Sequence, residues 1–226
     1  MNLWYLDDRV ISGPANTVAN YLAKLSTEQQ KIGLQLNPQK CEIEMPLLGD
    51  ETAFTRSHTI GCIESVLPGI EVTSLDAMCL LGLPLADGSM GAAVEKASGV
   101  VETLCHRLKY VDAHTALYFL THYVSAPRLT YVLRTSPLYK LSGMLDRIDD
   151  CVRSAGSLAM NVDISGRAWE QASLPPSFGG LGLRKVSSLA LPCYISSLIS
   201  CSGLIQCILS PNINRSEPLC LSDAIA

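Results

Sequence analysis

Two adjacent carboxylates, Asp7 and Asp8, stand between two short apolar segments in the stretch NLWYLDDRVISG. Neighbouring residues of a regular strand point to opposite faces, so both carboxylates can serve one site only where the backbone turns. Two close carboxylates repel each other unless a cation neutralises them, and Mg²⁺ binds one or two carboxylates plus substrate phosphates in nucleotidyl transfer. The pair is therefore a candidate Mg²⁺ or Mn²⁺ site, and the alternative is a polar hairpin turn that binds no metal.

The flanking sequence predicts the elements that hold this pair. Residues 3–6 and 10–12 are short β-prone runs, so we expect a tight hairpin with the carboxylates at its tip. Apolar residues then recur at helical spacing from Val18 to Ile32, with Gly33 as the stop signal. The stretch LQLNPQKCEIEM follows and is typical of a strand, an Asn-Pro turn and a second strand.

The periodicity of apolar residues is weaker after residue 45 and becomes helical near residue 90. Residues 46–68 have no sustained period, so we expect a loop with short strands. The stretches GIEVTS and MCLLGLPLADG are strand candidates. Three helices should follow, one from Met90, one from an N-cap at Asp112 to a break before Pro127, and one from Pro137. The stretch SLPPSFGGLGLRKV then predicts a turn-rich connection.

Composition indicates a packed core. The 226 residues are 48% apolar, and the nine cysteines form no C-x-x-C pair, so we expect reduced thiols in an intracellular protein of the nucleus or cytoplasm. The few apolar residues after Met1 are interrupted by charges, so we expect no signal peptide. Residues 189–209 carry no charge, and we expect a buried helix there and no membrane contact, with a membrane span as the alternative.

Charge is distributed unevenly along the chain, whose net charge is −4. Residues 1–95 hold five basic and twelve acidic residues, whereas residues 96–185 hold eleven basic and seven acidic ones. An acidic, metal-binding segment followed by a nucleic-acid-binding one would have this pattern, because divalent cations need carboxylates and phosphates need Lys and Arg. Ordinary variation in surface charge is the alternative.

Several motifs, in order, resemble the reverse transcriptases of non-LTR retrotransposons. YLDD at residues 5–8 resembles their Tyr-x-Asp-Asp hairpin, and GLQLNPQKCEI is similar to their Gly-Leu-x-Leu-Asn-x-x-Lys-Cys-Glu segment. LLGLP at residues 80–84 resembles the primer-grip hairpin. Residues 114–137 and LPPSFGGLGLR at 174–184 resemble the helical thumb and the region after it, so the resemblance covers the chain from residue 2 to about residue 200.

The resemblance implies a role for individual residues. Asp7 would be the principal metal ligand and Asp8 its neighbour, with Tyr5 near the primer end and Leu81 and Gly82 in the primer grip. Lys40 would donate a proton to, or orient, the pyrophosphate leaving group, and the alternative is a solvated turn lysine. Four residues would bind phosphates of an RNA template and DNA primer, or are ordinary surface charges: Arg107, Lys109, Arg128 and Arg134.

The resemblance also implies a fold and a division of the chain. We expect an α+β protein with a partial polymerase palm of antiparallel hairpins and a helix at 1–86, an all-helical thumb at 87–160, and a connection and tail at 161–226. The expected function is a fragment of an RNA-directed DNA polymerase that uses deoxynucleotides, catalytically incomplete because the upstream aspartate-bearing strand and fingers are missing. Mg²⁺ or Mn²⁺ is expected to bind only if the missing ligands complete the site. The alternatives are a non-enzymatic helical nucleic-acid-binding remnant and a decaying reading frame.

A truncated palm would leave apolar residues of the first hairpin uncovered. Leu3, Trp4 and Ile11 would then form an exposed sheet edge, and we expect self-association through it.

Overall fold

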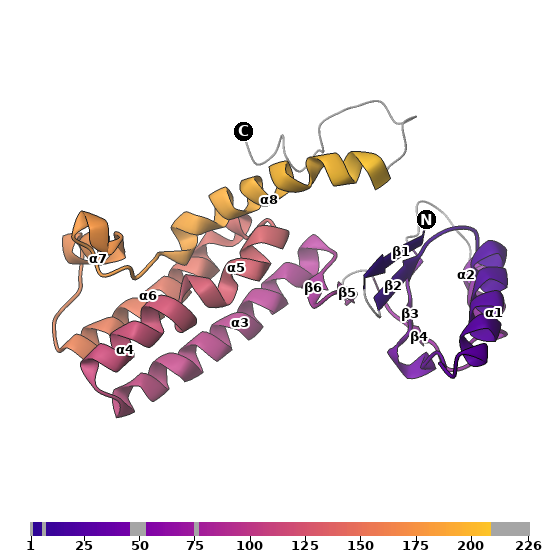
Figure 1. Ribbon diagram of the computed structural model, residues 1–226, viewed down its shortest axis with the longest axis horizontal. Coiled ribbons are helices and arrows are strands. Elements are labelled where there is room, and N and C mark those ends of the chain that lie inside the picture. The colour runs from indigo at the N-terminus through magenta and orange to yellow at the C-terminus, as the bar shows by residue number, and fades with distance from the viewer. Residues whose placement is uncertain (1, 6–7, 46–52, 75–76, 209–226) are drawn as a thin grey trace. The chain divides into compact units, whose positions relative to one another are not determined.

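A computed structural model of the chain describes residues 2–5, 8–45, 53–74 and 77–208 (Figure 1). The chain divides into two compact units, residues 1–89 and 90–226. The described residues are mostly helical and contain small two-stranded sheets in the first unit. The α and β content expected from the sequence is therefore present, with helix far in excess.

The first unit combines short paired strands with helices α1 and α2. Strands β1 and β2 form an antiparallel hairpin, β3 and β4 pair in parallel, and β5 and β6 form a second antiparallel hairpin. The bounds are β1 Asn2–Tyr5, β2 Asp8–Ile11, α1 Ala15–Lys31, the 3₁₀ turn η1 Pro38–Lys40, β3 Glu42–Ile43, α2 Ala53–Glu64, β4 Glu71–Val72, β5 Cys79–Leu80 and β6 Leu83–Pro84.

A small apolar core joins α1 to α2. Ala19 and Leu22 of α1 are buried together with Ile63 of α2, and Ile11 of β2 packs against them. The helix predicted from Val18 onwards is confirmed as α1, and Gly33 just after it has the positive φ of 77° that suits a helix stop. Ile32 is the exception, because it follows the helix and its side chain is 72% exposed.

Two predictions for the first unit are wrong. The loop with short strands expected at 46–68 contains helix α2, which buries few apolar side chains and so gives little periodic signal in the sequence. The strand expected before Asn37 is absent from the described residues, because the Asn37 side chain accepts a hydrogen bond from the Gln39 amide and starts η1. β3 pairs instead with the distant β4.

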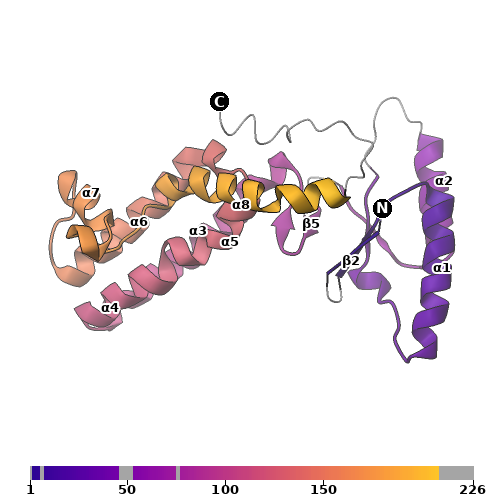
Figure 2. The ribbon, with the colours of Figure 1, turned by 45° about the horizontal axis from the view of Figure 1, so that its top comes forward.

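The second unit is a bundle of helices connected by short turns. Figures 1 and 2 show α8 beside α5 and α6, and contacts between these elements support that arrangement. The bounds are α3 Asp87–Arg107, the 3₁₀ turn η2 Leu108–Tyr110, α4 Ala113–Phe119, the π-helical segment η3 Leu120–Val124, α5 Ala126–Thr135, the 3₁₀ turn η4 Leu138–Leu141, α6 Ser142–Met160, α7 Arg167–Ser173, the 3₁₀ turn η5 Pro176–Phe178 and α8 Val186–Ile208.

The three predicted helices are confirmed in this unit, with small shifts at their ends. Asp112 caps α4, because its side chain accepts a hydrogen bond from the Thr115 amide at 3.1 Å. The break before Pro127 lies at Ser125, between η3 and α5. Residues after Pro137 first form η4, and α6 begins at Ser142. The buried face of these helices forms one continuous apolar core.

Helix α8 differs from the buried helix that we expected over residues 189–209. Val186, Ala190 and Tyr194 are buried, but Ile199 and Leu204 in the second half are 59% and 63% exposed. The helix therefore packs through its first half, and the prediction is wrong for the second. By length and composition alone, residues 186–206 could cross a membrane, and no other helix in the described part of the chain meets that test.

Candidate functional site

The β1–β2 hairpin positions the YLDD motif. The strands pair Leu3 with Val10 and Tyr5 with Asp8, so the predicted hairpin is confirmed. Leu6 and Asp7 separate the last pair in the sequence and lie outside the described residues. Tyr5 is 61% exposed and Asp8 is also exposed. Within the described residues, the motif therefore places the Asp8 carboxylate and the Tyr5 side chain at the solvent-exposed ends of the two strands.

A polar cluster fixes the opposite face of this hairpin to α1. The Arg9 guanidinium lies over the Tyr21 ring, 4.4 Å from its centroid, and Arg9 Nε donates a hydrogen bond to Asn2 Oδ1 at 2.9 Å. Asn2 Nδ2 donates to the Tyr21 hydroxyl at 3.3 Å. Burial lowers the pKa of Arg9, but the guanidinium stays charged. Because side chains alternate along a strand, Asp8 points away from this contact.

The described residues fit part of a metal site. Asp8 supplies the hard oxygen donor that Mg²⁺ prefers, and its carboxylate is accessible. No group of three or more His, Cys, Asp or Glu side chains that could hold a metal ion occurs among residues 2–5, 8–45, 53–74 and 77–208. A two-metal centre needs more carboxylates than this. Asp8 therefore fits a ligand role only in combination with groups outside the described residues, such as Asp7.

Lys40 lies at the end of η1, one residue before Cys41, whose carbonyl accepts a hydrogen bond from Glu71. Its side chain is exposed. Within the described part of the chain, no hydrogen bond or ion pair joins Lys40 to Asp8. The structure therefore gives Lys40 a defined backbone position, and its role beside a leaving group stays a prediction.

Leu81 and Gly82 form the turn of the β5–β6 hairpin. Leu80 pairs with Leu83, and the two turn residues have φ values of 52° and 77°. Positive φ at both central positions is the type I′ pattern that favours Asn-Gly, and a leucine there costs about 1 kcal/mol. The hairpin is confirmed, and it holds the 40% exposed Leu81 in a conformation that leucine rarely adopts.

The four predicted phosphate-binding residues lie in two places. Arg107 ends α3 and Lys109 follows in η2, where its Nζ lies 2.9 Å from His106 Nε2 and 4.9 Å from the Tyr110 ring centroid. Arg128 and Arg134 lie on α5, which packs on α8. All four side chains are exposed, and none forms an ion pair with a described carboxylate. Their charges are therefore available to an anionic ligand.

Sequence reasoning missed a cluster of aromatic side chains on α4 and η3. The Tyr118 ring stacks on His122 with a centroid separation of 4.5 Å, and the Tyr123 ring lies 5.9 Å from Tyr118 and 5.7 Å from Phe119. The signal was present as aromatic residues three to five positions apart on a predicted helix. It was hidden because such spacing usually belongs to a buried face.

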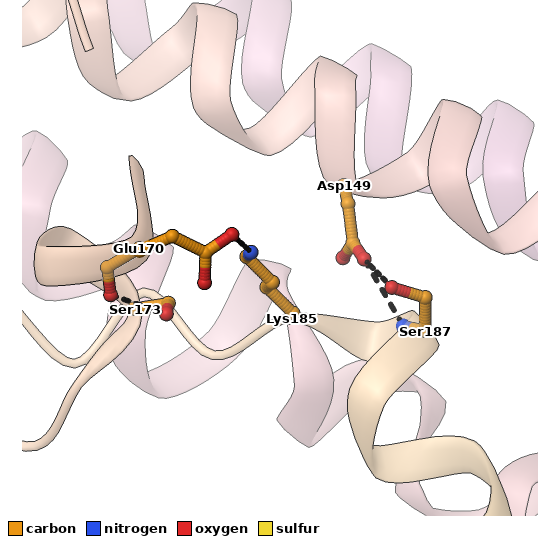
Figure 3. A network of polar contacts seen from close by, with 5 residues as sticks. All are labelled: Asp149, Glu170, Ser173, Lys185 and Ser187. Atoms are coloured by element: carbon orange, nitrogen blue, oxygen red, sulfur yellow. Dashed lines mark hydrogen bonds and ion pairs between the residues drawn. The ribbon is translucent and has the colours of Figure 1, made fainter. Parts of the chain in front are cut away.

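A polar network ties α6 and α7 to the start of α8 (Figure 3). The buried Asp149 carboxylate accepts hydrogen bonds from the Val186 amide at 2.6 Å, and from the Ser187 amide and hydroxyl at 3.0 and 2.6 Å. Lys185 forms an ion pair with Glu170. Burial raises the pKa of Asp149, and the hydrogen bonds oppose that rise. These contacts satisfy free amides at the helix start, so the network positions α8.

Comparison with known proteins gives one distant relative. The Retrotransposable element SLACS 132 kDa protein of Trypanosoma brucei gambiense is 24% identical over 187 residues, which cover 82% of this chain and 15% of that protein. No protein-family model matches the chain, and no solved structure matches it. The chain spans about 15% of the length of its curated relative and is distantly similar to a retrotransposable element protein.

Proposed function

We propose that the chain is part of an RNA-directed DNA polymerase of a retrotransposon. The observation that carries the proposal is the β1–β2 register, which pairs Tyr5 with Asp8, the first and last residues of the YLDD motif, on adjacent antiparallel strands. The distant similarity to a retrotransposable element protein over 82% of the chain supports it. Residues 1–86 would act as a partial palm and residues 87–160 as a thumb, followed by a connection and tail.

The proposal assigns the carboxylates of the hairpin to metal binding. Asp7 and Asp8 would hold Mg²⁺ or Mn²⁺, which, when bound, neutralises phosphate charge and activates the primer hydroxyl. Tyr5 lies on the same exposed face as Asp8 and would contact the primer end. Lys40, an exposed cation with mobile donors, would orient or protonate the leaving pyrophosphate. The turn residues Leu81 and Gly82 would support the primer.

The helical unit would hold the template and primer. Arg107 and Lys109 at the end of α3, and Arg128 and Arg134 on α5, would contact phosphates without reading sequence. Their exposure and their lack of an ion pair with any described carboxylate support this role. RNA template, DNA primer and deoxynucleotides are thus the proposed partners.

A second candidate function is nucleic-acid binding without catalysis. One observation favours it: the described residues contain no set of three metal-ligating side chains, whereas the helical unit has a continuous core and exposed cations. In that case the Asp-Asp pair would be only a polar turn, and the helices would retain the function.

Binding of an RNA–DNA template–primer duplex with and without Mg²⁺ tests the proposal. We expect Mg²⁺ to strengthen binding by the unchanged chain and to have little effect on Asp7→Asn, because an ion held by Asp7 and Asp8 would offset the repulsion between these carboxylates and the nucleic-acid phosphates. Glu64→Gln, which neutralises an exposed carboxylate of α2, is the matched control and should retain the effect. Equal Mg²⁺ dependence in the chain and Asp7→Asn would contradict the metal role and favour the second candidate.

Primer extension adds a direct readout of chemistry. DNA synthesis that Asp7→Asn abolishes would show that this chain contains every ligand the reaction needs, and the expected incompleteness would then be wrong.

A further inference from the structure

Four aromatic side chains form a continuous patch on the surface of the helical unit, and we name them the aromatic platform: Tyr118, Phe119, His122 and Tyr123. Tyr118, Phe119 and Tyr123 are 52%, 39% and 55% exposed, and His122 is also exposed. Single exposed aromatic residues are ordinary on a protein surface, but contiguous exposed apolar patches mark interaction sites.

The platform is held in a fixed arrangement. The rings of Tyr118 and His122 are nearly parallel, with an interplanar angle of 23°, and Tyr118 meets Phe119 edge to face at 6.0 Å. The His122 Nδ1 atom lies 3.0 Å from the Tyr118 carbonyl oxygen and 2.6 Å from the Thr121 hydroxyl oxygen, and these polar contacts hold the imidazole ring in place. A side-chain hydrogen bond with Tyr123 raises the pKa of Tyr118. The ring faces are therefore preorganised.

A π-helical segment underlies this arrangement. The Ser125 amide donates a hydrogen bond to the Leu120 carbonyl five residues earlier, at 3.3 Å, which closes a π turn. Leu120 and Val124 of the segment are buried, while His122 and Tyr123 between them are exposed. Tyr123 therefore lies on the exposed side of the π-helical segment, beside the rings of Tyr118 and Phe119.

The segment of sequence that carries the platform has a positive charge, which favours an anionic ligand. Residues 113–145 contain no Asp or Glu, and they include Arg128 and Arg134. Arg128, Tyr131 and Arg134 lie three positions apart along α5, so they are neighbours on one exposed face. Arg128 lies in the first turn of α5, the helix that follows η3 after the break at Ser125, and contacts join α5 to η3.

Flat rings beside cations match single-stranded nucleic acid. Bases stack on aromatic side chains whatever their sequence, while arginines follow the phosphates. Paired bases in a duplex are already stacked on each other, so only unpaired nucleotides can present a free face to these rings.

We propose that the aromatic platform, together with Arg128 and Arg134 of the next helix α5, binds an unpaired stretch of nucleic acid. The bases stack on Tyr118 and Tyr123, and the phosphates contact the two arginines of α5. The identification of this ligand as RNA rests on the proposed polymerase function. In that polymerase, the site would hold single-stranded template outside the primer duplex. It requires neither Asp7 nor Asp8.

Fluorescence anisotropy with labelled oligo(rA), in EDTA and with the full chain, tests this site. Replacing both tyrosines by Leu (Tyr118→Leu with Tyr123→Leu) should weaken binding about tenfold or more, because each lost base–ring stack is worth roughly that factor. Replacing both by Phe keeps the ring faces and should restore binding to within about twofold of the unchanged chain. Phe178→Leu changes a 73% exposed aromatic residue elsewhere in the unit and should have no effect.

A second measurement isolates the arginines. The logarithm of affinity falls with the logarithm of salt by about 0.7 for each phosphate neutralised on a single strand. Arg128→Gln with Arg134→Gln should therefore reduce that slope by about 1.4. Thermal unfolding of every variant checks that a loss of binding is not a loss of folding.

Three results would contradict the proposed binding of single-stranded nucleic acid to this site. The first is oligo(rA) binding that the two Leu replacements leave unchanged in a folded chain. The second is binding of an RNA–DNA duplex with no binding of the single strand. The third is competition by poly-glutamate as strong as that by unlabelled oligo(rA), which would identify an acidic protein as the partner. None of these depends on Mg²⁺, so the failure of the metal role and the failure of this site remain distinguishable.

Discussion

Gly180 has no space for a side chain. A Cβ atom there would lie 2.0 Å from the Leu174 carbonyl oxygen and 2.7 Å from that of Gln171. The Gly180 amide donates a hydrogen bond to the Pro175 carbonyl at 3.2 Å, and the flanking Gly182 amide donates to Leu174. In the LPPSFGGLGLR loop, the backbone at Gly180 therefore packs directly against the backbone of Gln171 and Leu174 at the end of α7.

Gly180→Ala should lower the free energy of unfolding by about 3 kcal/mol or more, because backbone atoms cannot move aside as a flexible side chain can. Gly99→Ala is the matched control, since Gly99 lies in the exposed interior of α3 with nothing within 4 Å of its added Cβ. That change should stabilise the chain by about 1 kcal/mol through helix propensity. Urea unfolding of both variants measures the difference, and equal effects would contradict the close packing at Gly180.

Individual residues were predicted from the sequence where one local rule decides their role. Asp112 was identified as an N-cap because an acid stood just before an apolar helical period. The contact of Arg9 with Tyr21 could not be foreseen, because it joins a strand to a helix and depends on which face of the hairpin meets α1. The strained φ of Leu81 was also hidden, because a Leu-Gly pair has no turn preference of its own.

Asp149 connects helix α6 to the start of helix α8. Its carboxylate receives two backbone amides at the start of α8 from a position on α6, 37 and 38 residues away in the sequence. Burial raises its pKa in the folded chain, so ionisation of Asp149 opposes folding. The stabilising contribution of the protonated group is fully present below the unfolded value of about 4 and is lost as the pH rises through the raised folded pKa.

Asp149→Asn cannot ionise and should therefore change the pH dependence of stability. The free energy of unfolding of the unchanged chain, minus that of Asp149→Asn, should be largest below about pH 4 and should fall as the pH rises. Urea unfolding across a pH series measures this difference. A difference that grows with pH would show that the hydrogen bonds from Val186 and Ser187 outweigh the cost of burial.

Elements were predicted well where the apolar period was long and local. The apolar stripes of α3 and α6 are visible in the sequence because each helix buries one face along most of its length, and the shorter stripe of α1 packs through Ala19 and Leu22. α2 was missed because it buries little, and the pairing of β3 with β4 was missed because parallel partners come from distant segments. The second half of α8 was expected to be buried because composition does not show which apolar side chains find neighbours.

At the scale of the whole molecule, the chain has two compact units with separate apolar cores, one around α1 and α2 and one through the helical bundle. Of the three residues expected at an exposed edge, Ile11 packs on the core of Ala19, Leu22 and Ile63, Leu3 is 37% exposed, and the side chain of Trp4 lies outside what the structure describes. Self-association through this edge stays a prediction. We propose that the hairpin of the first unit binds metal and that the helical bundle of the second unit binds nucleic acid.

Mn²⁺ binding to the full chain, followed by electron paramagnetic resonance, tests that claim most directly. We expect the unchanged chain to bind Mn²⁺ in the presence of template–primer duplex, and Asp7→Asn and Asp8→Asn each to weaken Mn²⁺ binding about tenfold or more, because each removes a carboxylate ligand. Glu64→Gln should bind as the unchanged chain does. Mn²⁺ affinity that is the same in all four proteins would contradict a metal-binding role for Asp7 and Asp8 and leave the hairpin as a polar turn.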